Sequence, residues 1–201
     1  MGNRQKHVAP TVLIGRRWIH IILITTVAFI LVLGAGLLSH RPDGRLHVAF
    51  LDVGQGDAIF IQSPGGRQVL IDGGRYPSQL LGELGRQMPF WDRSLDLVIA
   101  THPDEDHIAG LVSVVERYTI GRLITSTSAD QDIPLYEALI ESAAGGGIEV
   151  HVTRAGEILD LGDGVRMEIL HPDSTFSATD RNETSIVAHL IYGELSILFT
   201  G

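Results

Sequence analysis

The chain has 201 residues, of which 44% are hydrophobic, and a formal net charge of −9. This length and hydrophobic content exclude wholesale disorder. There is no cysteine, which excludes a disulfide framework, a cysteine nucleophile and cysteine-ligated zinc. The mean hydropathy is +0.19 although the chain is acidic. The apolar residues must therefore be unevenly distributed.

Residues 18–38 contain no Asp, Glu, Lys or Arg. A helix of this length rises about 30 Å, which is the thickness of the hydrocarbon core of a bilayer. Four basic residues and no acidic residue precede it. This bias predicts a single-pass protein of the cell membrane with a cytoplasmic N-terminus. A cleaved signal peptide is the alternative, because the small residues Gly34, Ala35 and Gly36 lie near the end of the run.

The sequence predicts four segments: a basic cytoplasmic leader (1–17), a transmembrane helix (18–38), a linker (39–45) and an extracytoplasmic domain (46–201). After residue 38 there are 11 basic and all 24 acidic residues, so this part carries a charge of −13. Such a charge disfavours an extended basic groove of the kind that holds nucleic acid.

The domain is expected to alternate strands and helices. Residues 95–100 form a continuous apolar run, typical of a central strand that is covered on both faces. The pattern predicts an α/β fold with two sheets and helices packed outside them. Strands are expected at 46–53, 57–62, 68–71, 95–100, 122–125, 149–153, 157–160, 165–170, 185–192 and 195–200, and helices at 78–87, 108–118 and 134–144.

Four residues of types that bind metals lie within six positions between the strand 95–100 and the helix expected from Ile108. They are His102, Asp104, Asp106 and His107. Imidazole suits zinc or iron, whereas carboxylates favour harder ions such as manganese. The alternative is structural, because acidic residues at a helix N-terminus also cap the helix and complement its dipole.

The segment His102-x-Asp104-x-Asp106-His107 resembles the H-x-H-x-D-H signature of the metallo-β-lactamase superfamily, with Asp104 in place of the second histidine. Further segments resemble the C-terminal hydrolase domain of the ComEC-type competence proteins, which are DNA-uptake channels. These segments are Leu51-Asp52-Val53-Gly54-Gln55-Gly56-Asp57-Ala58, Leu70-Ile71-Asp72-Gly73-Gly74, Asn182-x-x-Ser185 and Leu198-Phe199-Thr200-Gly201. The resemblance covers about residues 46–201 and implies a metallo-β-lactamase-like αββα sandwich.

The resemblance also implies roles for residues. His102 and Asp104 would bind one divalent ion and Asp106 and His107 a second, both Zn or Mn, with Asp106 catalytic. Asp72 would orient ligands by hydrogen bonds, and Asp57, Asn182 and Ser185 would lie beside the ligands or the substrate. Two departures stand out: residues 180–185 contain no histidine, and the aspartate expected after Gly201 lies beyond the end of the sequence. We therefore expect the domain to be incomplete at its C-terminus.

The expected function is that of a membrane-anchored metal-dependent hydrolase, a phosphodiesterase or nuclease related to competence DNA uptake that uses a metal-activated hydroxide. Expected partners are single-stranded DNA or another phosphodiester and a membrane channel protein. One alternative is a hydrolase of small esters, lactams or nucleotides. Another is a membrane-tethered binding or sensing domain without turnover, which the missing histidine favours. Arginines along an open groove would indicate a nucleic-acid strand, and the candidates are Arg75, Arg154 and Arg181.

Overall fold

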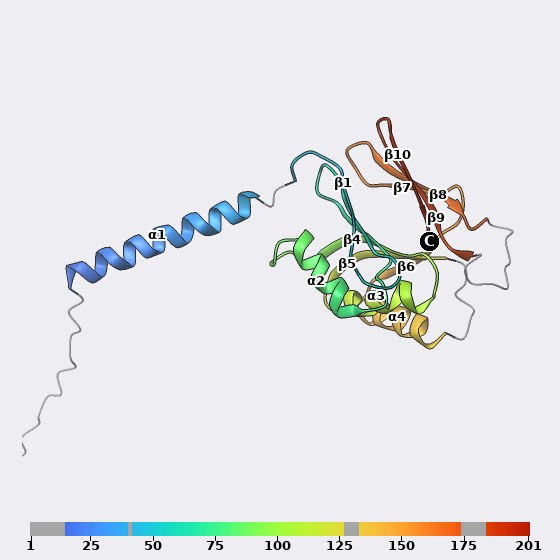
Figure 1. Ribbon diagram of the computed structural model, residues 1–201, viewed down its shortest axis with the longest axis horizontal. Helices are drawn as coiled ribbons and strands as arrows, with labels where there is room; N and C mark the ends of the chain where they lie inside the picture. Colours follow the sequence, from blue (N-terminus) through green and yellow to red (C-terminus); the bar gives the residue numbers. More distant parts are fainter. Residues whose placement is uncertain (1–14, 40–41, 127–132, 174–183) are drawn as a thin grey trace, which may run out of the picture. The chain divides into compact units, whose positions relative to one another are not determined.

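The computed structural model describes residues 15–39, 42–126, 133–173 and 184–201 (Figure 1). It divides into two units, Met1–Arg41 and Pro42–Gly201. The first contains helix α1 (Arg16–Ser39). Its segment Arg16–Gly34 is long and apolar enough to cross a membrane, and none of it is buried inside the protein. Length and composition fit a membrane span and a signal sequence equally.

The second unit is built on a six-stranded sheet in the order β1-β2-β3-β4-β5-β6. Strands β1, β2 and β3 pair antiparallel, whereas β3 to β6 pair parallel. Helices α2, α3 and α4 connect the parallel strands, as parallel pairing requires. The bounds are β1 (His47–Phe50), β2 (Ile59–Gln62), β3 (Gln68–Ile71), α2 (Pro77–Gln87), β4 (Ser94–Ala100), α3 (Glu105–Val115), β5 (Thr119–Thr125), α4 (Pro134–Gly145) and β6 (Glu149–Val152).

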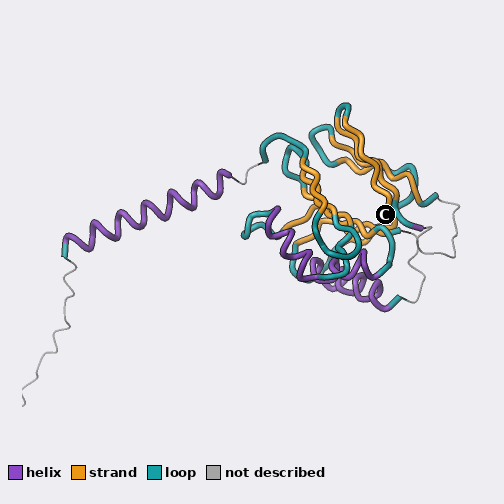
Figure 2. Tube along the Cα trace, in the orientation of Figure 1, coloured by secondary structure: helices purple, strands orange, loops and turns teal. Residues whose placement is uncertain are grey.

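A second, four-stranded antiparallel sheet packs on the first. Its order is β10-β9-β8-β7, and Figure 2 shows its strands on the side of the larger sheet opposite to the three helices. Its members are β7 (Ile158–Asp160), β8 (Val165–His171), β9 (Val187–Tyr192) and β10 (Leu195–Thr200).

Two hydrophobic cores follow from this layering. One lies between the helices and the large sheet, and the other lies between the two sheets. Strand β4 serves both, because Leu95 and Val98 face the helices while Leu97 and Ile99 face the second sheet. The apolar run at 95–100 is thus the doubly covered central strand that the sequence predicts. The α/β fold with two sheets is confirmed, whereas the second helical layer of an αββα sandwich is not among the described residues of this unit.

Several predicted element boundaries were wrong, among them the end of β1 and the start of α3. Strand β1 ends at Phe50 and not at Val53, because the chain turns there and the N–H of Val53 donates to the carbonyl of Leu51. Helix α3 begins at Glu105 and not at Ile108. Glu105 and Asp106 form its first turn, where negative charge complements the helix dipole. Asp106 and His107 are therefore helical residues and do not belong to a loop.

Close backbone contacts hold α3 against the end of β3. The N–H of Gly110 donates to the carbonyl of Gly74 at 3.0 Å, and the N–H of Gly73 donates to the carbonyl of His107 at 2.7 Å. A Cβ atom at Gly110 would lie 2.0 Å from the carbonyl oxygen of Gly73. Only glycine at position 110 allows the helix to approach this closely.

Gly110→Ala is therefore expected to destabilise the protein by about 3 kcal/mol, at the upper end of overpacking costs, because the new methyl group meets backbone that cannot yield. Gly82→Ala is the matched control, since a Cβ there has nothing within 4 Å and alanine raises helix stability by up to about 1 kcal/mol. Urea-induced unfolding followed by circular dichroism measures both changes. Equal stability of the two variants would contradict the close approach.

Candidate metal centre

The predicted site residues lie where β3 and β4 end. Asp72 follows β3, and Thr101 and His102 follow β4. The N–H of Asp72 donates to the carbonyl of Ile99 at 2.8 Å, which fixes the two strand ends side by side. His107 reaches the same point from the first turn of α3. The carboxyl ends of adjacent parallel strands are a common position for ligand sites in α/β folds.

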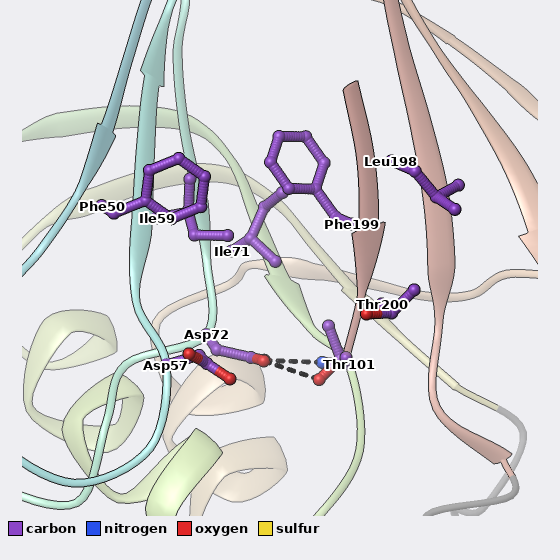
Figure 3. A pocket seen from close by; sticks show the side chains of 10 residues that line it. Phe50, Asp57, Ile59, Ile71, Asp72, Thr101, Leu198, Phe199 and Thr200 are labelled. Atoms are coloured by element: carbon purple, nitrogen blue, oxygen red, sulfur yellow. Dashed lines mark hydrogen bonds between the residues drawn. The ribbon is translucent and has the colours of Figure 1, made fainter. Parts of the chain in front are cut away.

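The Asp72 carboxylate is the centre of a buried hydrogen-bond network. Its side chain is 1% exposed and its φ is +56°, a left-handed conformation that Asp tolerates better than most residues. One oxygen accepts the backbone N–H of Thr101 at 2.8 Å. The other accepts the Thr101 hydroxyl at 2.6 Å and pairs with Nδ1 of His107 at 2.8 Å. Figure 3 shows the two bonds between Asp72 and Thr101.

These bonds determine which nitrogen of each imidazole ring carries the hydrogen and how the ring is oriented. Because a carboxylate only accepts, Nδ1 of His107 donates to Asp72, so that in the neutral ring Nε2 carries the lone pair. The Thr101 hydroxyl donates its only hydrogen to the bond with Asp72. Its oxygen therefore accepts Nδ1–H of His102 at 3.0 Å. The two rings lie 4.0 Å apart between centroids, at 48°. Two neighbouring histidines thus each keep Nε2 for a ligand, the arrangement that metal-binding histidines require.

The same surroundings shift the two histidines in opposite directions. Burial lowers the pKa of His102, and the positive charge of His107 lowers it further, although nearby aspartates oppose this. Burial also lowers the pKa of His107, but the hydrogen bond and the charge of Asp72 outweigh it, so this pKa is raised. His102 therefore favours the neutral form that binds metals.

The structure does not draw all four predicted ligands together. The nearest carboxylate oxygen of Asp104 lies 3.8 Å from Nε2 of His102. Asp106 is half-buried in the first turn of α3. Within the described ranges, no group of three or more His, Asp or Glu side chains is close enough to hold a metal ion. The assignment of these residues as four ligands therefore stays a prediction.

The residues present nevertheless fit a metal ion in part. The N-cap residue Asp104 makes no side-chain hydrogen bond that caps α3. Two imidazole nitrogens and nearby carboxylates are a donor set that suits Zn or Mn. The two imidazoles are held in place by the buried hydrogen bonds of Asp72 and Thr101.

A cavity of about 290 Å³ adjoins Asp72 and Thr101. Asp57 lines it at the same end, and Phe50 and Phe199 form its apolar part (Figure 3). The two rings lie 6.5 Å apart between centroids. A substrate in this cavity would therefore meet carboxylate and aromatic surface.

The remaining predicted residues differ in position. Ser185 is buried, and its hydroxyl has no hydrogen-bond partner among the described residues. It lies close to the site, because the N–H of the next residue, Ile186, donates to the carbonyl of Thr101 at 3.0 Å.

Asn182 lies outside the described residues, as does Arg181. Arg75 pairs with Glu105 at 2.9 Å, so its charge is not fully available to a nucleic-acid strand.

Thr101 is the functional residue that the sequence did not single out. Its hydroxyl joins Asp72 to His102 and thereby links both histidines to one carboxylate. The signal was its place directly between the apolar strand and His102. A hydroxyl at that position can reach a neighbouring strand end as well as the ring that follows it.

Comparison with known proteins identifies the family of the chain. Residues 51–201 match the family model of the metallo-β-lactamase superfamily. The chain belongs to this superfamily. The match includes β4, the segment from His102 to His107 and Asp72, so the resemblance that the sequence suggested is confirmed.

The chain is also similar to ComE operon protein 3 of Bacillus subtilis (strain 168), at 29% identity over 170 residues. The alignment covers 77% of this chain and 22% of that protein, so the chain spans about a fifth of its relative. This relation supports the expected link to ComEC-type proteins.

Two solved superfamily structures share the fold. A mutant of a HARLDQ-motif metallo-β-lactamase from Cronobacter sakazakii has a TM-score of 0.54 and 14% identity over 80% of this chain and 63% of that chain. The Rm3 metallo-β-lactamase has a TM-score of 0.51 and 19% identity over 79% of this chain and 58% of that chain. At these identities, the likeness concerns the fold alone.

Replacing the Thr101 hydroxyl tests the network. Thr101→Val leaves the buried Asp72 oxygen without its O–H donor and should lower the free energy of unfolding by about 1–3 kcal/mol. Thr101→Ser keeps the hydroxyl and loses one methyl group, so its cost should stay near 1 kcal/mol or below. Urea-induced unfolding compares them. Valine and serine variants of equal stability would show that the hydroxyl contributes nothing.

Proposed function

We propose that the protein is a membrane-anchored, metal-dependent hydrolase that cleaves a phosphodiester. The observation that carries the proposal is the network around Asp72, which holds two buried imidazoles with Nε2 unused. Structural histidines need no such arrangement, whereas ligand histidines do. Membership of a superfamily of metal-dependent hydrolases supports the same reaction class.

Two divalent ions, Zn or Mn, are the proposed cofactors, one held by His102 and Asp104 and the other by Asp106 and His107. Such ions lower the pKa of a bound water and hold substrate oxygens, which supplies a nucleophile at neutral pH. The protein's own residues position the ligands and supply the proposed catalytic carboxylate. Asp72 and Thr101 fix the tautomer and orientation of both rings, and the Asp106 carboxylate is the proposed catalytic group on α3.

The proposed substrate is a phosphodiester such as single-stranded DNA. The relation to a protein of the ComE operon supports a link to competence and DNA uptake, and a membrane channel protein is the proposed partner. The charge of −13 after residue 38 disfavours a long basic contact with a strand. We therefore propose short contacts at the metal centre, with little contribution from Arg75 because Glu105 pairs with it.

The proposed location is the cell membrane, with residues 18–38 as a single span, a cytoplasmic N-terminus and an extracytoplasmic hydrolase domain. Helix α1 has the length and composition for this role. The basic leader Arg4, Lys6, Arg16 and Arg17 supports the orientation.

A second candidate is a tethered binding or sensing domain without turnover. It is favoured by the lack of a three-ligand group within the described part of the chain. Metal analysis of the purified chain separates the two functions. At least about one tightly bound divalent ion per chain is expected for the enzyme, and a metal-free protein after incubation with Zn or Mn would leave only the binding function.

Asp72→Asn should weaken the binding of Zn or Mn by about 10–100-fold, because the amide no longer holds Nδ1–H of His107 as a carboxylate does. Asparagine tolerates the left-handed backbone at this position, so the fold should persist. Asp43→Asn is the matched control, since that carboxylate also pairs with a histidine, His47, at 2.9 Å. Isothermal titration gives the affinities, and equal values for the two variants would argue against Asp72 as a positioning residue.

Asp106→Ala should abolish metal-dependent cleavage of single-stranded DNA and of a model phosphodiester while the circular dichroism spectrum stays unchanged. Glu116→Ala, at the other end of the same helix, should retain cleavage. Cleavage is measured with added Zn or Mn and again with a chelator. Undiminished, chelator-sensitive cleavage by the Asp106 variant would remove Asp106 from the mechanism.

A further inference from the structure

The loop between α2 and β4 exposes two large aromatic side chains. Phe90 is 78% exposed and Trp91 is 44% exposed. Their rings meet edge to face, with centroids 4.7 Å apart, and neither residue belongs to a hydrophobic core. Adjacent exposed aromatic residues on a soluble domain mark a surface that contacts something apolar.

The strand directions place this loop at a defined end of the domain. Strands β1, β3 and β4 run the same way, because β2 pairs antiparallel with β1 and β3 while β3 pairs parallel with β4. The start of β1 and the loop before β4 therefore share one end of the sheet. Asp72 and Thr101, which follow β3 and β4, lie at the opposite end.

Contacts across the sheet show how close the loop lies to the point where the chain enters the domain. Gln68 donates to the carboxylate of Asp92 at 2.8 Å, directly after Trp91. Gln68 pairs with Gln62, which in turn pairs with His47, the first residue of β1. Neighbouring strands are about 4.8 Å apart, so the loop lies about 15 Å from His47.

The chain before β1 limits how far this end can lie from a membrane. Only residues 40–46 separate α1 from β1. Fully extended, they reach at most about 28 Å. If α1 lies in a bilayer, this linker would allow the end of the domain that carries Phe90 and Trp91 to reach the lipid.

The side chains around the loop suit the membrane interface. Tryptophan and phenylalanine favour the boundary between headgroups and acyl chains. Arg93 and Arg117 line a hollow of about 290 Å³ together with Phe90 and Asp92, and arginines beside an inserted ring can meet headgroup phosphates. The domain is acidic overall, so the aromatic rings and not the net charge would drive the contact.

We propose that the Phe90–Trp91 loop binds the surface of the bilayer, which turns the metal centre away from the membrane. The inference rests on the proposed membrane anchoring through α1. The proposed binding partner is lipid. Anionic lipid is not required, because burial of the two apolar rings drives the contact.

Fluorescence quenching in lipid nanodiscs tests the loop in the full chain. The chain has two tryptophans, so Trp18→Phe leaves Trp91 as the only emitter. Phosphatidylcholine brominated near the headgroup should reduce Trp91 emission by about twofold or more if the ring lies at the interface. The matched control combines Phe50→Trp with Trp18→Phe and Trp91→Phe, because Phe50 is 72% exposed at the other end of β1. Emission from the tryptophan introduced at position 50 should not change.

Each other outcome has a distinct meaning. If the emission of Trp91 is quenched no more than that of the tryptophan at position 50, the proposal is overturned. Blue-shifted Trp91 emission that bromine does not quench also overturns it, because protein and not lipid then covers the ring. Trp91→Phe alone leaves Trp18, which reports on α1. Quenching of Trp18 without quenching of Trp91 overturns the loop contact only, whereas an unquenched Trp18 overturns the membrane anchoring itself.

Discussion

One buried carboxylate organises the functional end of this domain. Asp72 accepts hydrogen bonds from the backbone and the hydroxyl of Thr101 and from the ring of His107, and through Thr101 it also determines the tautomer of His102. A carboxylate that is 1% exposed would be costly to bury without these donors. The end of β3, the end of β4 and the start of α3 must therefore meet at this point, and the rest of the fold serves to bring them there.

The surrounding layers make that meeting possible. Strand β4 is packed on both faces and cannot shift without disturbing two cores. Helix α3 approaches β3 so closely that Gly73 and Gly110 exchange backbone hydrogen bonds with the opposing segments. Gly56 adds a third contact, since a Cβ there would lie 1.6 Å from the carbonyl oxygen of Asp106. Glycine at these positions thus helps to form the candidate metal centre, although it supplies no ligand.

Much of this arrangement was predictable from the sequence. The apolar run at 95–100 indicated the central strand, and the positions of Asp72, His102 and His107 indicated a site at strand ends. Other features depended on three-dimensional contacts. The role of Thr101 arises only because β3 lies beside β4, and the early start of α3 reflects acidic residues that favour both a helix N-terminus and a metal. Spacing along the chain cannot separate these two uses of the same carboxylates, so the ligand role of Asp104 and Asp106 stays a prediction.

The hydrogen bonds around Asp72 have a consequence for the order of events. In small metal-stapled domains the ion assembles its own ligands, so that folding and loading are one process. Here His102 and His107 are held by protein partners alone, inside a domain that has two hydrophobic cores of its own. This arrangement would let the domain fold first and bind the proposed ions afterwards. A chelator would then remove the proposed activity reversibly, without unfolding the protein.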